Sequence, residues 1–188
     1  MLNQKFNAAE ALESGTVKLN LERGRLLERL HQDYSEQREV LDNAILHFER
    51  ISRTLYEDEW SGSLTVAPKE NGPQFEISIQ GAESRGVNNM QIFCFDMMLM
   101  LLCAERGKSP GFLIHDSHLF DGVDERQVGK ALAIGADLST KYGFQYIVTM
   151  NTDVVPEETP AGFSLEAHVL PIRLTDAVED GGLFGFRF

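Results

Sequence analysis

The stretch that decides the fold is residues 111–127, GFLIHDSHLFDGVDERQ. Its apolar run at residues 111–114 leads to Asp116, a polar turn follows, and a helix-like segment begins near Glu125. This order is typical of a buried strand that presents a carboxylate at its carboxyl end. In open α/β sheets, ligands bind in the crevice outside the carboxyl ends of the strands. The stretch therefore predicts a ligand site, and we expect a nucleotide with its metal ion there.

The neighbouring segments complete an alternation of helices and strands. Residues 90–104 are apolar on almost every face, which predicts a buried helix, and residues 123–142 predict a surface helix. Residues 146–150 predict a second strand, which is closed by Asn151. The order helix, strand, helix, strand implies parallel neighbours in one sheet, so we expect an α/β fold.

Residues 1–58 are predicted to form a helical arm, and residues 59–188 a separate domain. Five residues of the arm fall at strict seven-residue intervals: Leu27, Tyr34, Leu41, Phe48 and Leu55. This heptad pattern predicts a long helix with coiled-coil character over about residues 24–57. Gly15 and Gly24 are expected to interrupt the earlier part, and Gln37 breaks the series. An amphipathic helix packed on its own domain gives a similar pattern and stays open as the alternative.

The rest of the second domain carries weaker signals for strands. Residues 63–67 and 75–79 predict a β-hairpin around an Asn-Gly turn. Residues 163–174 predict one or two short strands. The tail, residues 181–188, holds three phenylalanines between glycines. We expect it to pack on the domain as a terminal strand, with a docking peptide as the alternative.

Composition places the chain among ordinary globular proteins and limits its partners. Its 188 residues are 43% hydrophobic and 24% charged, with a formal net charge of −12. This acidic balance argues against a large nucleic-acid patch on the chain, because phosphate neutralisation needs clustered Lys and Arg. Cys94 and Cys103 lack metal-type or redox-type spacing and are expected to be buried thiols in a reducing compartment.

Targeting signals give the expected location. The N-terminal segment does not combine the features of a secretory signal. The longest unbroken apolar stretch, residues 97–104, is too short to span a bilayer. We therefore expect a cytoplasmic protein with no membrane partner.

Polar residues at two strand ends and one helix start are the candidates for chemistry. Asp116 suits Mg²⁺, held through water while substrate phosphates complete the shell; its alternative role is to cap the next turn. The loop Ser84-Arg85-Gly86 precedes the buried helix and offers N–H groups and a hydroxyl to an anion, with a plain N-cap as the alternative. Asn151 follows the second strand and is placed to reach the same phosphate, or else to form a turn.

The order of these elements resembles the C-terminal half of a coiled-coil ABC-type ATPase head, as in the structural-maintenance-of-chromosomes (SMC) and double-strand-break-repair ATPases. More closely, it is similar to the uncharacterised bacterial domain at the C-terminal end of SMC-like proteins. The phrases FLIHDSHLFDGVDERQ and FQYIVTMNTD carry the resemblance, which covers about residues 25–155. It implies an α/β fold: the C-terminal lobe of a P-loop ABC-type ATPase head, a parallel sheet flanked by helices, with an N-terminal coiled-coil helix.

The resemblance also implies roles for individual residues. Asp116 matches the Walker B aspartate, which supports Mg²⁺ beside ATP. Ser84 and Gly86 match the signature loop, which in a dimer faces the γ-phosphate bound by the opposite subunit. Asp124 matches the D-loop aspartate at the dimer seam. Asn151 matches the switch position after the following strand.

Several positions depart from the family pattern. Ser117 stands where the family has its catalytic glutamate, and a serine cannot polarise the attacking water in the same way. Asn151 replaces the usual histidine, and Arg85 interrupts the double glycine of the signature loop. Hydrolysis is therefore expected to be slow or to use another residue. The candidates for that residue are His115, His118 and Asp121.

The chain lacks a Walker A sequence, Gly-x4-Gly-Lys-Ser/Thr. Gly107-Lys108-Ser109 imitates its end, but Leu102 stands where the first glycine is required. We therefore expect an N-terminal Walker A lobe, in the same longer chain or in a partner chain, to complete the site for ATP and Mg²⁺. The resemblance implies a head-to-head dimer.

Function beyond nucleotide binding rests on the resemblance alone, which implies DNA maintenance or defence, with DNA bound elsewhere than on this acidic chain. Two other classes stay open. One is a metal hydrolase built on His115, Asp116 and His118, although consecutive residues of a strand point to opposite faces. The other is a non-catalytic interaction module built on a degenerate ATPase lobe.

Overall fold

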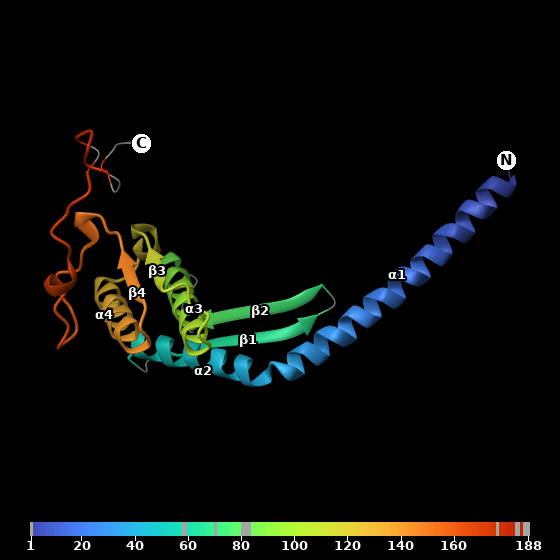
Figure 1. Ribbon diagram of the computed structural model, residues 1–188, viewed down its shortest axis with the longest axis horizontal. Helices are drawn as coiled ribbons and strands as arrows, with labels where there is room; N and C mark the ends of the chain where they lie inside the picture. The colour runs from blue at the N-terminus through green and yellow to red at the C-terminus, as the bar shows by residue number, and fades with distance from the viewer. Residues whose placement is uncertain are drawn as a thin grey trace.

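A long helical arm and a small lobe make up the molecule (Figure 1). The computed structural model describes residues 2–57, 60–69, 71–79, 84–175, 177–182 and 185. Helix α1 (Leu2–Glu36) extends away from the lobe, and α2 (Arg38–Leu55) continues it into the lobe after a bend at Gln37. The lobe is mixed α/β and holds two small sheets among the described residues.

Helix α1 begins earlier than the heptads predicted and runs through both of its glycines. A Cβ added at Gly15 or Gly24 would meet nothing within 4 Å. The expectation that these glycines interrupt the helix is therefore wrong. An exposed glycine costs a helix about 1 kcal/mol relative to alanine, which continued backbone hydrogen bonding tolerates. Gln37, which breaks the heptad series, lies at the bend between the two helices.

The heptad series packs on the lobe in α2, whereas α1 carries an exposed apolar row in a different register. In α2, Phe48 and Leu55 are fully buried, and the helix packs on α3 and β1. Packing on the chain's own lobe, the alternative reading of the heptads, accounts for the pattern there. In α1, Leu27 and Tyr34 of the series are half-buried, and a separate row of leucines one position out of register is 72%, 66% and 67% exposed: Leu12, Leu19 and Leu26. Coiled-coil pairing of α1 and the domain boundary at residue 58 stay predictions.

The predicted hairpin is confirmed and its arms are longer than expected. Strands β1 (Gly62–Lys69) and β2 (Gly72–Ile79) pair antiparallel along their whole length. Gly62 lies directly on α2, where its N–H donates to Ser52 Oγ at 2.8 Å. A Cβ at this position would lie 2.6 Å from a ring carbon of Phe48. The start of the hairpin therefore requires a residue without a side chain.

The substitution Gly62→Ala is expected to lower the free energy of unfolding by about 1–3 kcal/mol, because the added methyl group overpacks the contact with Phe48 and Ser52. Gly24→Ala is the matched control and is expected to be neutral or stabilising. Urea denaturation of both variants measures the difference. Wild-type stability in Gly62→Ala would contradict the close approach of β1 to α2.

Helix α3 (Arg85–Glu105) forms the centre of the lobe, as its apolar sequence predicted. It packs against α2, α4, β2 and the η1 turn. Its fully buried side chains are Met90, Phe93, Cys94, Met97, Met98 and Leu101. Burial raises the pKa of the Cys94 thiol, and Cys103 is half-buried. The expectation of a buried thiol is confirmed for Cys94.

The length of α3 corrects the expectation about membrane-spanning segments, which considered residues 97–104 alone. The whole helix has 21 residues and, by length and composition only, is long and apolar enough to cross a membrane. Of the most apolar 18-residue window of this helix, 44% is buried inside the lobe. A core helix of a soluble protein passes the same test, so this property is weak evidence for a membrane segment.

Tyr56, at the C-terminal end of α2, is a buried phenol with an unusual environment. Its ring lies 5.3 Å from that of Trp60, between centroids, and its side chain is 6% exposed. Among the described residues, no hydrogen-bond partner of its hydroxyl is found. Burial, and to a lesser degree the Cys94 thiol, raise the pKa of Tyr56 to about 12.

This raised pKa predicts an alkaline loss of stability. The folded state holds the Tyr56 proton more tightly than the unfolded chain, so the stabilisation is complete below the unfolded pKa of about 10 and falls as the pH rises towards 12. Tyr56→Phe removes the ionisable group and is expected to flatten the fall in thermal midpoint over this range. Tyr142→Phe is the control. An unchanged pH profile in Tyr56→Phe would contradict the assignment.

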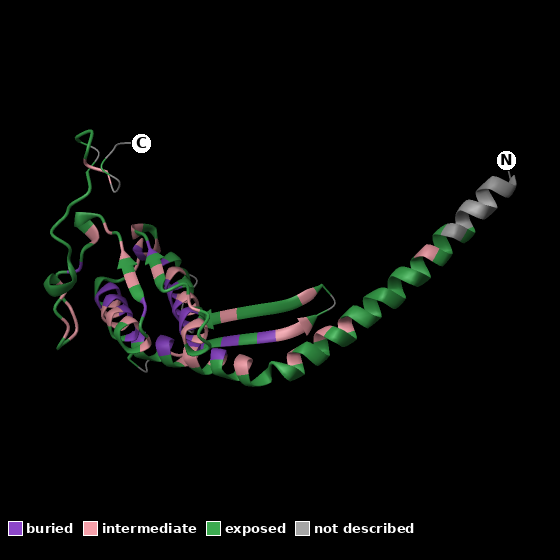
Figure 2. Ribbon diagram, viewed as in Figure 1, coloured by how far each residue is buried: buried purple, intermediate pink, exposed green. Residues whose placement is uncertain are grey.

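The predicted parallel strands are confirmed, but the sheet that they form is small. Strands β3 (Phe112–His115) and β4 (Gln145–Val148) pair in parallel. Helices α3 and α4 (Glu125–Tyr142) cover one face of the pair. The other face carries large apolar side chains that are 49%, 53% and 40% exposed: Phe112, Ile114 and Ile147. Figure 2 shows the exposed positions along both strands.

Beyond β4 the described chain is irregular. Its regular elements are two turns of 3-10 helix, η2 (Thr152–Val154) and η3 (Glu166–His168). The predicted strands in residues 163–174 are wrong for this structure, because a strand needs a neighbouring edge and both sheets of the described chain have two strands only. The expectation of a terminal strand falls largely on residues 183–184 and 186–188, outside the described residues.

Candidate functional site

Asp116 follows β3 directly and begins the next turn, η1 (Ser117–Phe120). Its Oδ1 accepts the backbone N–H of His118 at 2.9 Å, and its side chain is exposed at the surface. The aspartate is therefore an N-cap, one of the two roles that the sequence allowed. A carboxylate has several acceptor positions, so this cap leaves capacity for a hydrated cation.

The Ser84-Arg85-Gly86 loop forms the start of α3 and lies against the loop after η1. Ser84 is the N-cap and its Oγ accepts the N–H of Val87 at 3.4 Å. Gly86 is buried against Gly122, and a Cβ on Gly86 would overlap the Gly122 carbonyl. Gly122 itself has a φ of +71°, a conformation that favours glycine. Two glycines thus bring two predicted parts of the site into contact.

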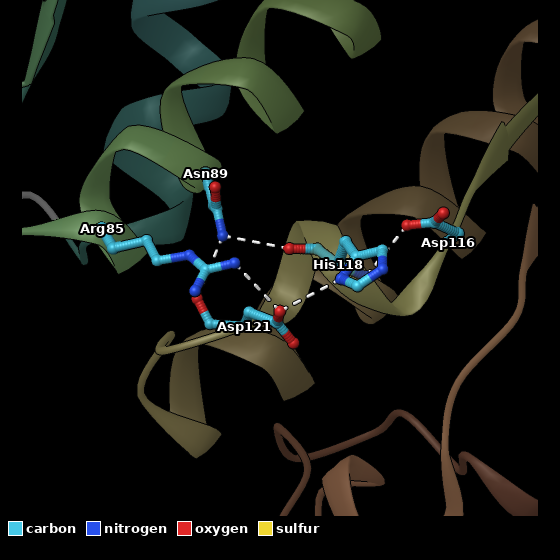
Figure 3. A network of polar contacts seen from close by, with 5 residues as sticks. All are labelled: Arg85, Asn89, Asp116, His118 and Asp121. Carbon is cyan, nitrogen blue, oxygen red and sulfur yellow. Dashed lines mark hydrogen bonds and ion pairs between the residues drawn. The ribbon is translucent and has the colours of Figure 1, made fainter.

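A polar network joins the same two loops (Figure 3). Arg85 Nη2 and His118 Nδ1 lie 3.1 Å and 3.2 Å from Asp121 Oδ2. Asn89 Nδ2 donates to the carbonyl oxygens of His118 and Asp121 at 3.1 Å and 3.0 Å. The start of α3 is therefore fixed to the turn that carries Asp116, and the side chains of Arg85 and His118 stay exposed.

Asp124 and Asn151 do not join this network. Asp124 is the N-cap of α4, and its Oδ1 accepts N–H groups of Arg126 from backbone and side chain at 3.1 Å and 3.2 Å. Asn151 begins η2, is exposed and makes no side-chain cap. Asn151 and Asp116 both follow the carboxyl ends of paired strands, yet no contact joins these two described side chains.

The donor set of the site suits Mg²⁺ held with substrate phosphates better than a metal held by protein alone. Among the described residues, no three His, Cys, Asp or Glu side chains are grouped closely enough to hold a metal ion. His115 turns into the lobe while Asp116 lies at the surface, so these neighbours point apart. The three-residue site of a metal hydrolase is not formed. A single carboxylate such as Asp116 is a normal protein contribution to a Mg²⁺ site.

His115 is the buried centre of a partly buried polar chain that the sequence did not reveal. Its Nε2 lies 3.2 Å from Asp96 Oδ2, and its Nδ1 lies 3.0 Å from the hydroxyl of Tyr146. An ionised carboxylate accepts only, so Nε2–H donates to Asp96. In the neutral imidazole Nδ1 is then an acceptor, and the Tyr146 hydroxyl donates to it. His115 is 6% exposed, and its two nitrogens are both used.

This chain connects α3, β3 and β4 immediately below Asp116. The Tyr146 ring rests on α4 at Gly135, where a Cβ would overlap the ring. Burial, and secondarily the charge of Asp96, raise the pKa of Tyr146. The signal in the sequence was the acidic residue in an apolar helix: Asp96 is the one charged residue in residues 90–104.

The substitution Tyr146→Phe is expected to lower the free energy of unfolding by about 1–3 kcal/mol, because it leaves the buried Nδ1 of His115 without a donor. Tyr142→Phe is the matched control. Its hydroxyl accepts from Arg50 at the surface, so its loss should cost within about 0.5 kcal/mol. Chemical denaturation measures both values. Equal costs for the two variants would show that the polar chain is not formed.

The comparisons with known proteins identify a family and two distant structures. A family model described as an uncharacterised protein conserved in bacteria (DUF2326) matches residues 51–188. No curated protein matches the chain.

A solved structure concerned with ATP-driven dimerization and DNA-stimulated activation of SMC ATPases is 18% identical. The match has a TM-score of 0.48 and covers 64% of this chain and 74% of the chain in that structure. An SMC head bound to the C-terminal winged-helix domain of ScpA is 17% identical. This match has a TM-score of 0.40 and covers 61% of this chain and 36% of the chain in that structure. Both likenesses are too distant to assign a function to the chain.

Proposed function

The chain belongs to the DUF2326 family of uncharacterised bacterial proteins, and we propose that it is the C-terminal half of an SMC-like ATPase head. In this proposal a separate lobe with a Walker A sequence, in the same longer chain or in a partner, cradles the phosphates of ATP. The present lobe supplies the magnesium-side carboxylate and the signature-like loop. The physiological role is DNA maintenance or defence, with DNA bound on another part of the assembly.

The incomplete parallel sheet is the observation that carries the proposal. Parallel strands occur almost exclusively in sheets with both faces covered. Here β3 and β4 have helices on one face, and Phe112, Ile114 and Ile147 are exposed on the other. Because the turn that carries Asp116 follows β3, a lobe that completed this sheet would also meet the candidate site. The nucleotide site would then be formed jointly by the two lobes.

The contact between the start of α3 and the η1 loop supports the assignment of the site. Gly86 packs on Gly122, and Asn89 binds the same loop through two hydrogen bonds. The magnesium-side Asp116 and the signature-like Ser84 are therefore held on one rigid unit. In the proposed head-to-head dimer, Ser84 and Gly86 face the γ-phosphate of the opposite subunit. Asp124 lies at the seam, and Asn151 contacts the nucleotide of its own lobe.

The residue that activates water remains the weakest element of the proposed ATPase. Ser117 replaces the expected glutamate and is not a general base for water. His118 is exposed on the next turn of chain and its Nδ1 contacts Asp121 Oδ2. This pair is the best-placed alternative, since a carboxylate that holds one imidazole nitrogen leaves the other to accept a proton. We therefore expect slow hydrolysis.

A non-catalytic interaction module is the second candidate. The observation that favours it is that Ser84, Asp116 and Asp124 all serve as helix N-caps, a structural role that explains these residues without a ligand. In that case the lobe binds its partner through the open face of β3 and β4 and turns over no ATP.

The substitution Asp116→Asn tests the nucleotide assignment. Asparagine caps a helix as well as aspartate does, so the η1 turn is preserved while the charge that attracts Mg²⁺ is removed. The variant, assembled with a lobe that carries Walker A, is expected to lose ATP- and Mg²⁺-dependent dimerisation and at least about 100-fold of any ATP turnover. Light scattering and phosphate release measure these effects.

Asp137→Asn is the matched control, because Asp137 is exposed on α4 and the charge change is the same. It is expected to behave as wild type. Dimerisation of Asp116→Asn with ATP and Mg²⁺ at the wild-type level would contradict the magnesium role. Assembly of the two lobes with no nucleotide effect in the wild type would favour the interaction module.

A further inference from the structure

The segment at residues 169–175 follows η3 and has apolar side chains at alternate positions, but among the described residues it joins no sheet. Its alternate apolar residues Leu170, Ile172 and Leu174 are 74%, 76% and 49% exposed. Figure 1 shows this segment on the far side of α4 and β4 from α3, and Figure 2 shows it as exposed. We call residues 169–175 the C-terminal arm. Three large apolar side chains at two-residue spacing, all facing water, indicate a strand without its sheet.

The backbone of the arm shows which of its edges is available. In an extended strand the N–H and C=O groups of alternate residues point to opposite edges. Pro171 has no N–H, and the N–H of Thr175 donates to the carbonyl of Gly181 across a turn at 2.9 Å. The edge that carries Pro171 and Thr175 therefore lacks a donor at Pro171, and its donor at Thr175 is already hydrogen-bonded within the chain. Among the described residues, no backbone hydrogen bond is found on the opposite edge, which is formed by Leu170, Ile172 and Leu174.

The charge around the arm indicates the partner's chemistry. Residues 151–182 hold seven acidic residues and a single Lys or Arg, which is Arg173. A surface that receives this segment must bury its apolar side chains while it compensates the surrounding negative charge. Lys and Arg along the rim of an apolar sheet edge meet both requirements.

We infer that the C-terminal arm adds as a β-strand to an open sheet edge of the partner lobe, with Leu170, Ile172 and Leu174 on its buried face and basic residues of the partner around it. Strand addition uses main-chain hydrogen bonds for affinity and alternate side chains for specificity. The inference rests on the proposed function, because it takes the Walker A lobe as the partner. It adds a second attachment to the open face of β3 and β4.

The variant Ile172→Asp in the full chain tests the inference, with Thr175→Asp as the matched control. Residue 172 is exposed, so its replacement should leave the thermal midpoint of the isolated chain unchanged. Its affinity for a separately expressed Walker A lobe should fall about 10-fold to 100-fold, since an isoleucine side chain is no longer buried and a charge is placed in its site. Thr175→Asp introduces the same charge at an alternate position and can still accept the Ala177 N–H, so it should bind as wild type.

Hydrogen exchange gives a second readout on the backbone. In the complex, the amide protons of Leu170, Ile172 and Leu174 should become protected, and in the isolated chain they should exchange freely. Equal affinity of Ile172→Asp and wild type for the Walker A lobe, or no protection of these amides in the complex, would contradict strand addition by the C-terminal arm. The proposed function would be unaffected.

Other outcomes separate the occupants. If the wild-type chain formed a dimer without the Walker A lobe and Ile172→Asp stayed monomeric, the arm would bind a second copy of this chain. That result would contradict the Walker A lobe as its partner. Failure of the wild-type chain to bind the Walker A lobe at all would overturn the proposed function and the arm together.

Discussion

The burial of α3 is the constraint on which the rest of the structure depends. This helix is apolar on almost every face, and each fully buried large side chain contributes about 1.5–3 kcal/mol only if other elements cover it. Helices α2 and α4, strand β2 and the η1 turn provide that cover. The position of α3 in turn fixes its N-terminus against the loop after β3, where Gly86 meets Gly122. The candidate site is therefore a consequence of how the core is packed.

The site is built from groups that also hold the ends of helices. Ser84, Asp116 and Asp124 each accept a backbone N–H from the first turn of the element that follows. The same unpaired N–H groups that need a cap also create the positive end of a helix, where anions bind. Caps and phosphate ligands therefore use the same residue types at the same positions. This overlap explains why the ATPase reading and the interaction-module reading both fit these three residues.

The described part of the chain exposes several apolar surfaces, and they have different geometry. One is the helix-free face of β3 and β4, another is the C-terminal arm, and the third is the stripe of Leu12, Leu19 and Leu26 along α1. A flat sheet face, a single strand and a long helix each need a different kind of cover. A second lobe with an open sheet edge and its own arm helix would cover all three, which is what the proposed head requires.

The sequence by itself determined the local elements. The heptads, the Asn-Gly turn and the run that ends on Asp116 predicted the helices, the hairpin and the parallel strands, because periodicity and turn chemistry are local properties. The expectations at Gly15 and Gly24 and in residues 163–174 were wrong because local signals do not include the surroundings: the helix continued through both glycines, and the strand-like segment has no neighbouring strand among the described residues.

Tertiary structure alone decided which residues meet. It placed Arg85 on Asp121, left Asn151 apart from Asp116, and joined Asp96, His115 and Tyr146 in a partly buried chain. No sequence spacing encodes these contacts, since they depend on how α3 lies across the strands.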